Sequence, residues 1–552
     1  MPPMRVSSSD DPAGHRSGED PDLFYRPPQV PVPGLRGIVP GAGSPYCAAC
    51  RHGVDGEASG AGGSDQPIQL STSREDQRAS PKGHILGAMN LSSSRALLRH
   101  AHTAFTPAVF GAFLGAAFLG TALLSVPAAF PQTAPASAKI DAAFEAFWSA
   151  ASPDEAARRV DAIVKSGVTF DEAMRRLKAG RTYAAQKSGV VFQSNKTSDG
   201  VEHNFAVNVP ANYDPSRRYQ VRFQLHGGIG ASVDNHPRNN GEIGALAGAE
   251  QIYVLPYAWE DAPWWGDDQI LNLDAIVDSL KRTWNVDENR VVLSGVSDGA
   301  TGAYFIAMRE TTPFASFLPL NGFIMVLSNG EIDDGQIFPG NLVNKPLFVI
   351  NGGKDRLYPT SIVEPYTRHL MSSGVEIEYH PQPEGEHNTK WWPEMKEPFE
   401  KFVAAHPRAP HPAKLSWEAA DPAHNRAHWL VIEELGQAAG EAREMADANL
   451  MQEGQRRSEM FGDRARTGGH GRVDAVRAGN TVTASTKGVT AFTLLLSPDV
   501  FDFEQPVKVV ANGKEVFNAK VARSLPALLN WAARDNDRTM LYGAELKIQM
   551  GK

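Results

Sequence analysis

The chain has 552 residues, 21% of them charged, and a formal net charge of -9. This length exceeds what one hydrophobic core usually holds, so two or more domains are expected. The acidic balance and the lack of a long basic stripe argue against a nucleic-acid partner, because no continuous basic surface would bind the backbone phosphates. Both cysteines, Cys47 and Cys50, lie near the amino end and lack a second pair. We therefore expect no disulfide framework in the remainder, no metal site and no cofactor.

Residues 1–88 are rich in Pro, Gly, Ser and charge, and too few periodic apolar residues are present to offset the entropy of ordering. We expect a disordered extension that is not translated if synthesis begins at Met89. From there, Arg95 and Arg99 precede an apolar stretch that ends in small residues, so residues 89–138 resemble an export signal. The alternative is an uncleaved membrane anchor, since the stretch is long enough to span a bilayer. Both interpretations predict a secreted or periplasmic protein, with membrane contact only through that anchor.

Residues 139–190 are expected to form a helical segment. Ser152–Glu155 and Thr169–Glu172 have the capping-box pattern of a helix start, and Gly180 closes the second helix. The first helix carries an apolar stripe of four side chains: Ile140, Phe144, Phe147 and Trp148. Such a stripe is typical of packing, and we interpret the segment as a lid or brace against the domain that follows.

An alternating strand at residues 219–225 runs into His226-Gly227-Gly228. Small residues after a strand let backbone NH groups approach a substrate oxygen closely, so Gly227 and Gly228 are candidate oxyanion-hole residues. His226 is interpreted as a structural residue that holds this loop. Farther along, Trp264 and Trp265 are candidates to line an acyl or aromatic pocket, with packing as the alternative.

A Gly-Val-Ser-Asp-Gly sequence, residues 295–299, separates an apolar strand-like run from a helix-like run. This context predicts a sharp turn that presents Ser297 on a strained elbow. Side chains at Gly295 and Gly299 would collide with the neighbouring strand and helix. The NH of Asp298, at the helix N-terminus, is a further candidate donor to a developing oxyanion. A chance Gly/Ser turn is the alternative.

A serine nucleophile needs a base, and the base needs an acid that holds its tautomer. Asp355 follows the apolar run 345–350, and His387 follows the strand-like run 375–380. Each lies past the carboxyl end of a strand, where open α/β sheets collect their ligands, so we expect both beside Ser297. Turn or solvated-loop roles are the alternatives. The rivals are less well placed: Asp333, Asp334, His380, His406 and His411.

Residues from about 200 to 405 resemble the α/β-hydrolase superfamily, within it the secreted esterase branch with polyhydroxybutyrate depolymerase-like and feruloyl esterase-like enzymes, and the prolyl-oligopeptidase-type catalytic domains. The matching segments are 209–215, 225–228, 285–291, 295–299, 351–355 and 385–387. The resemblance implies a doubly wound, mostly parallel α/β sheet over residues 191–405. It also implies a serine hydrolase that cleaves a small-molecule or polymeric carboxylic ester. The alternatives are a serine peptidase, disfavoured because no propeller repeat is present, and a non-catalytic binding protein on the same scaffold.

Prolines 407, 410 and 412 mark a linker at residues 406–414. The remainder, residues 415–552, has strand-like runs at 428–432, 473–476, 480–484, 492–496 and 507–510. Short strands at this spacing predict a small β-sandwich, with Asn512-Gly513 as a hairpin turn. Residues 436–471 are expected to form a helix and a mobile loop. Substrate binding and stabilisation are both open as roles for this domain.

Overall fold

The computed structural model describes residues 136–550 except 199, 232–240, 329–336 and 437–469. Contacts divide the chain into two units, Met1–His52 and Gly53–Lys552, and all of the described residues belong to the second. The expected extension, the two cysteines and all of the expected export signal except residues 136–138, which begin the first helix, therefore lie outside the described residues. So do Asp333, Asp334 and most of the 436–471 segment. Within the described ranges, no helix is both long and apolar enough to cross a bilayer.

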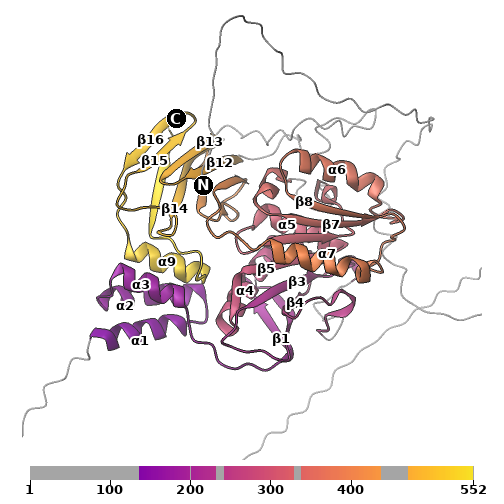
Figure 1. Ribbon diagram of the computed structural model, residues 1–552, viewed down its shortest axis with the longest axis horizontal. Coiled ribbons are helices and arrows are strands. Elements are labelled where there is room, and N and C mark those ends of the chain that lie inside the picture. The colour runs from indigo at the N-terminus through magenta and orange to yellow at the C-terminus, as the bar shows by residue number, and fades with distance from the viewer. Residues whose placement is uncertain (1–135, 199, 232–240, 329–336, 437–469, 551–552) are drawn as a thin grey trace, which may run out of the picture. The chain divides into compact units, whose positions relative to one another are not determined.

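An eight-stranded sheet, in the order β1-β2-β4-β3-β5-β6-β7-β8, forms the middle of the chain (Figure 1). Its strands are β1 Gly189–Lys196, β2 Glu202–Val209, β3 Tyr219–Leu225, β4 Ile252–Pro256, β5 Val286–Val296, β6 Ser316–Leu320, β7 Leu347–Gly352 and β8 Ile377–Gln382. The β1–β2 and β2–β4 pairs are antiparallel, and every pair from β4–β3 to β7–β8 is parallel. The predicted mostly parallel α/β sheet is confirmed.

Helices cover both faces of this sheet. They are α4 Asp267–Thr283, α5 Asp298–Arg309, α6 Thr360–Ser372 and α7 Trp392–Ala405. Alternate strand residues enter different cores: Val291 and Leu293 of β5 pack with α4 and α5, whereas Val292 packs with α7. Burial on both faces explains why β4, β6 and β7 are nearly continuous apolar runs in the sequence.

Three helices precede the sheet: α1 Ala136–Trp148, α2 Pro153–Lys165 and α3 Phe170–Ala179. Phe144 and Phe147 of the predicted stripe are buried with Leu528 and Leu529 of α9, a helix near the carboxyl end (Figure 1). The interpretation of a lid or brace against the eight-stranded sheet is therefore wrong for this stripe. The apolar face of α9, which the sequence analysis left unassigned, is the surface that the stripe covers.

The carboxyl region is a sandwich of a four-stranded sheet, β10-β11-β14-β17, and a five-stranded sheet, β16-β15-β13-β12-β9. Its elements are β9 Lys414–Ala419, β10 Arg426–Ala427, β11 Leu430–Leu435, β12 Gly471–Ala478, β13 Thr481–Lys487, β14 Val489–Leu496, β15 Val507–Ala511, β16 Lys514–Ala519, α9 Leu525–Asp535 and β17 Ala544–Gln549. Side chains from both sheets share one core. The predicted sandwich is confirmed, and Asn512 and Gly513 have the positive φ angles, 49° and 77°, of a hairpin turn.

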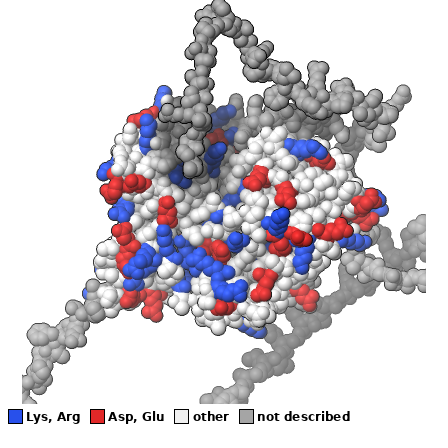
Figure 2. Space-filling model, in the orientation of Figure 1, with Lys and Arg blue, Asp and Glu red and all other residues white. Residues whose placement is uncertain are grey.

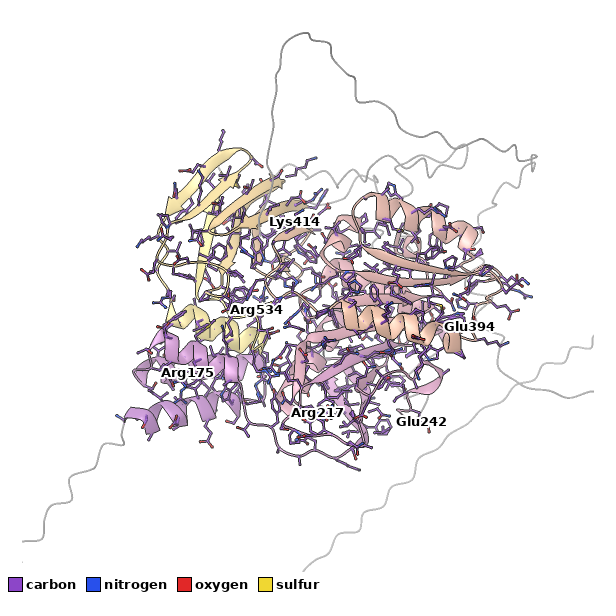
Figure 3. All side chains as sticks on the ribbon, in the orientation of Figure 1. Arg175, Arg217, Glu242, Glu394, Lys414 and Arg534 are labelled. Carbon is purple, nitrogen blue, oxygen red and sulfur yellow. The ribbon has the colours of Figure 1, made fainter. Side chains whose placement is uncertain are left out.

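Charged side chains are interspersed over the face shown in Figure 2, with a band of Lys and Arg toward its lower left. Several project into solvent, such as Arg175 of α3, whose side chain is 73% exposed (Figure 3). Exposed charges of this kind contribute little to stability. A group of buried charges lies where the sandwich contacts the eight-stranded sheet.

Asp537, after α9, is the centre of this buried junction. Its carboxylate lies 2.6 Å from Arg408 Nη2 and 3.6 Å from Lys281 Nζ, and the Arg408 and Asp537 side chains are fully buried. Burial acts to raise the pKa of Asp537, but Arg408 and Lys281 hold that pKa far below its usual range. The linker, α4 and the sandwich are thereby joined through one carboxylate.

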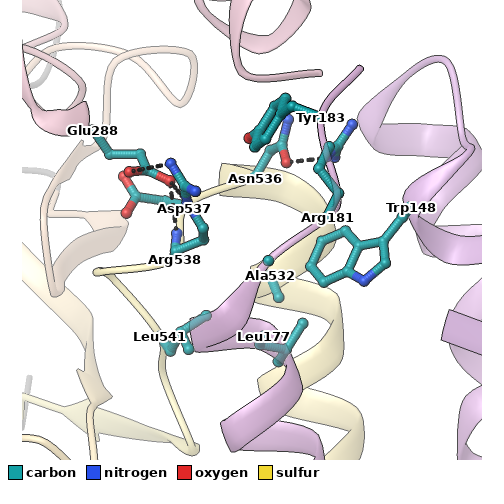
Figure 4. A pocket seen from close by; sticks show the side chains of 11 residues that line it. Trp148, Leu177, Arg181, Tyr183, Glu288, Ala532, Asn536, Asp537, Arg538 and Leu541 are labelled. Atoms are coloured by element: carbon teal, nitrogen blue, oxygen red, sulfur yellow. Dashed lines mark hydrogen bonds and ion pairs between the residues drawn. The ribbon is translucent and has the colours of Figure 1, made fainter. Parts of the chain in front are cut away.

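A small pocket near the same junction is lined by residues of the amino-terminal helical segment, by Glu288 of β5 and by residues in and after α9 (Figure 4). Arg181 donates to Asn536 Oδ1 at 2.8 Å, and Arg538 Nη2 donates to Glu288 Oε2 at 3.0 Å. The space that remains is about 10 Å³. That volume is no more than one water molecule requires, so these contacts fill the pocket rather than leave a ligand site.

Candidate active site

Ser297 occupies the sharp turn between β5 and α5. Its φ of 56° and ψ of -117° are strained for a residue with a side chain, typically by about 1–3 kcal/mol. A Cβ at Gly295 would lie 2.0 Å from Gly299 O, and one at Gly299 would lie 2.2 Å from Leu225 O. Both distances are impossible for real atoms, which confirms the steric reason for the two glycines.

The structure brings Asp355 and His387 to the same end of the sheet as Ser297. His387 Nε2 lies 2.9 Å from Ser297 Oγ, and His387 Nδ1 lies 2.7 Å from Asp355 Oδ2. The three residues follow β5, β7 and β8, whose carboxyl ends lie at one edge because the strands are parallel. An acid, an imidazole and a hydroxyl thus form one continuous chain of hydrogen bonds.

Asp355 is 3% exposed and is held by the loop that carries it. Its Oδ1 accepts hydrogen bonds from Leu357 N at 2.8 Å and Tyr358 N at 2.9 Å. Burial acts to raise the pKa of Asp355, but the hydrogen bonds from His387 and these two amides outweigh it, so the pKa lies below its usual value. Oδ2 is left to orient the imidazole, whose ring packs edge-on against the ring of Tyr358 with 5.8 Å between the ring centroids.

The Gly227-Gly228 loop lies directly against the elbow. A Cβ at Gly227 would lie 2.8 Å from Ser297 Cβ and 2.9 Å from Val296 O. His226 anchors the start of the loop: Ala258 N donates to its Nε2 at 3.3 Å, and its Nδ1 lies 3.0 Å from Gly227 O. These contacts agree with a structural role for His226.

Trp264 does not line a pocket, and that part of the sequence interpretation is wrong. The side chain is fully buried in the main core, where a substrate cannot reach it. Its Nε1 donates to His226 O at 2.8 Å, and its ring packs edge-on against the His226 ring, with 5.2 Å between the ring centroids. Trp264 therefore supports the loop from behind. Trp265 is only partly buried against the core, and its contact with substrate stays a prediction.

Asn321, at the end of β6, is a supporting residue that the sequence analysis missed. It is buried with a φ of 52°, and its Nδ2 donates to Asn388 O at 2.8 Å. The bond fixes the residue next to His387. A polar residue directly after the apolar run 315–320 was the available signal, because polar residues at a strand's carboxyl end often belong to a site.

A cavity of about 540 Å³ lies elsewhere, lined in part by Asp274, Glu310 and Arg426. Glu310 follows the last residue of α5, whereas Ser297 precedes its first. The helix has 12 residues, so the two flanking residues are 13 steps apart, which at the usual rise of about 1.5 Å per residue is about 20 Å. Burial and the Glu310 carboxylate raise the pKa of Asp274. This cavity is lined by none of the residues Ser297, Asp355 and His387.

No group of three or more His, Cys, Asp or Glu among the described residues could hold a metal ion.

No family model matches the chain. The chain is 27% identical over 181 residues to a probable feruloyl esterase C of Aspergillus terreus. The match covers 31% of this chain and 66% of the fungal protein, slightly less than two thirds of its length.

Solved structures match this chain with low TM-scores. A thermostable esterase has a TM-score of 0.33 and 19% identity, over 40% of this chain and 63% of its own. The apo form of Thermogutta terrifontis esterase 2 has a TM-score of 0.32 and 14% identity, over 40% of this chain and 96% of its own. A putative dipeptidyl aminopeptidase IV from Bacteroides ovatus has a TM-score of 0.33 and 18% identity, over 40% of this chain and 36% of its own.

The strand order, the helices on both faces and the elbow after β5 define an α/β-hydrolase fold. The sequence match to an esterase agrees with the resemblance found in the motifs and supports a hydrolase.

Proposed function

We propose that this protein is a secreted serine hydrolase that cleaves carboxylic esters through Ser297, His387 and Asp355. One observation carries the proposal: the two hydrogen bonds, 2.9 Å and 2.7 Å, that join the hydroxyl to the imidazole and the imidazole to the buried carboxylate. The strained backbone of Ser297 supports it, because such strain is concentrated at functional sites.

In this proposal, Ser297 Oγ attacks the ester carbonyl while His387 Nε2 takes its proton. Asp355 accepts a hydrogen bond from Nδ1–H, which keeps Nε2 free as the base and stabilises the imidazolium that forms. The NH groups of Asp298 and of the Gly227-Gly228 loop donate to the oxyanion. His387 then returns the proton to the leaving alcohol, and water, activated by the same imidazole, releases the acid.

Ester substrates are preferred over peptides in this proposal for a chemical reason. An alkoxide or phenoxide leaves readily, whereas an amine must be protonated firmly and a peptide usually needs a subsite that grips its backbone. The similarity to a probable feruloyl esterase supports the ester choice.

Matched substrates test this choice. We expect kcat/KM for a p-nitrophenyl ester to exceed that for the p-nitroanilide of the same acyl group, after each is divided by its uncatalysed rate. Methyl ferulate and a polymeric ester in the same panel define the acyl group. Efficient anilide cleavage with weak ester turnover would favour a peptidase, and no turnover of either would favour a binding protein.

Secretion is tested separately. If residues 89–138 are an export signal, the mature amino terminus of secreted protein should lie between about Ala128 and Lys139. Mass spectrometry of the culture medium measures it, and intact cytoplasmic protein that begins at Met1 would refute export.

A further inference from the structure

We propose that Asp298 is a positioning residue for the oxyanion hole, in which its carboxylate holds the Gly227-Gly228 loop against the nucleophile elbow. The inference rests on the proposed function and deepens it. Asp298 is the residue after Ser297 and the first of α5, and its Oδ2 accepts a hydrogen bond from Ile229 N at 2.9 Å. One residue therefore offers its own NH to the oxyanion and ties down the loop that supplies the other donor.

The bond completes a tether at both ends of the loop. Before the glycines, His226 is fixed because Trp264 Nε1 donates to its carbonyl at 2.8 Å and Ala258 N donates to its ring. After the glycines, Ile229 is buried and its NH is bound by Asp298. Two adjacent glycines give the loop little stiffness of its own, and Gly228 has a φ of 68°. Without the second anchor, the glycine NH groups would sample positions away from the oxyanion.

The carboxylate of Asp298 is both a hydrogen-bond acceptor and a negative charge, and these two properties have separate effects. A negative carboxylate beside a forming oxyanion repels it, although the N-terminus of α5 favours an anion at the first helical position. Positioning needs only an oxygen that accepts from Ile229 N. An asparagine supplies that oxygen without the charge, so the asparagine variant distinguishes a positioning role from an electrostatic one.

The test compares Asp298→Ala and Asp298→Asn on p-nitrophenyl acetate. Removal of one well-placed oxyanion donor typically lowers kcat by about 10²–10³-fold. A loosened loop still carries its donors, so it should lower kcat by a smaller factor. We expect Asp298→Ala to lower kcat by about 10–100-fold with less than about a threefold change in KM. Asp298→Asn should stay within about threefold of wild type in both.

An alkyl trifluoromethyl ketone gives a second readout, because its serine adduct carries the oxyanion. Its inhibition constant should rise in Asp298→Ala in proportion to the loss in kcat/KM, since both report transition-state stabilisation. Thr301→Ala is the matched control: the Thr301 hydroxyl lies buried in the same helix and, among the described residues, has no hydrogen-bond partner. Its kinetics should match those of wild type.

Ile229→Pro removes the same hydrogen bond from the donor side and guards against an Asp298→Ala protein that fails to fold. The double variant should be no slower than the worse single variant, because both changes delete one bond. The inference is overturned if Asp298→Ala keeps kcat within about threefold of wild type, or if Asp298→Asn loses as much as Asp298→Ala. If wild type itself shows no ester turnover and no serine labelling, the proposed function fails, and this inference with it.

Discussion

Asp355 illustrates how single residues acquire their roles here. It is buried, which disfavours its charge, yet two backbone amides and the imidazole of His387 keep its pKa below the usual value. An ionised carboxylate that is already held in place can orient the base without reorganising during the reaction.

Asp355→Asn should therefore leave the fold intact and lower kcat by about 10³–10⁴-fold, because an amide stabilises the wrong imidazole tautomer. Steady-state kinetics on an aryl ester measure the loss, with circular dichroism as the check on folding. A variant with more than a tenth of the wild-type kcat would remove Asp355 from the proposed mechanism.

At the scale of elements, the strands that bear the site residues could be predicted from sequence. Strand β7 and residues 291–293 of β5 are apolar runs because both faces are covered, and β5, β7 and β8 each lead into a polar or glycine-rich loop. The helix starts were predictable for a similar reason: Ser152 Oγ accepts from Glu155 N at 3.2 Å, and Thr169 Oγ1 accepts from Glu172 N at 3.3 Å.

What the sequence could not predict depends on contacts between distant segments. Nothing local distinguishes Trp264, which is fully buried, from Trp265, which is only partly buried. The partner of the α1 stripe was equally hidden, because α9 lies more than 370 residues later in the chain. The hydrogen bond that Ile229 N donates to Asp298 Oδ2 likewise joins the loop after β3 to the first residue of α5, and the sheet order brings these segments together.

The linker between α7 and β9 contains a histidine that should respond to pH. His411 has two ring nitrogens without hydrogen-bond partners among the described residues, and its ring packs edge-on against Tyr542 at 5.6 Å. Burial lowers the pKa of His411 to about 4, with Arg408 and Arg477 acting in the same direction and Asp499 and Asp537 opposing it.

A folded-state pKa below the unfolded value means that the unfolded chain binds the proton first as the pH falls. His411 should thus make the free energy of unfolding fall between about pH 6.5 and pH 4, by at most about 1.4 kcal/mol per pH unit. Urea unfolding of wild type and His411→Leu across this range measures the difference, and the variant should have the flatter profile. Identical pH profiles would contradict a neutral buried imidazole.

At the scale of the whole described molecule, the sandwich is bonded to the α/β-hydrolase region rather than loosely tethered. Asp537 pairs with Arg408 of the linker and lies near Lys281 of α4, while Arg538 pairs with Glu288 of β5. Asn344 adds a further link, since it donates to Ser416 O and accepts from Ser416 N in β9. We expect the two regions to unfold together.

Asp537→Asn should lower the free energy of unfolding by about 3–5 kcal/mol, because it leaves buried positive charge uncompensated. Asp499→Asn is the control: its carboxylate pairs with Lys178, but the side chain is 32% exposed and should contribute under about 1 kcal/mol. Urea unfolding followed by circular dichroism compares the two. Equal losses would show that the buried junction does not hold the regions together.

Covalent labelling tests the central claim most directly. Wild-type protein is incubated with a fluorophosphonate, and intact mass and peptide mass spectrometry locate the adduct. We predict one equivalent on Ser297, none in Ser297→Ala, and labelling slowed by orders of magnitude in His387→Ala. An adduct on another residue, or full labelling of Ser297→Ala, would contradict the assignment of Ser297 as the nucleophile.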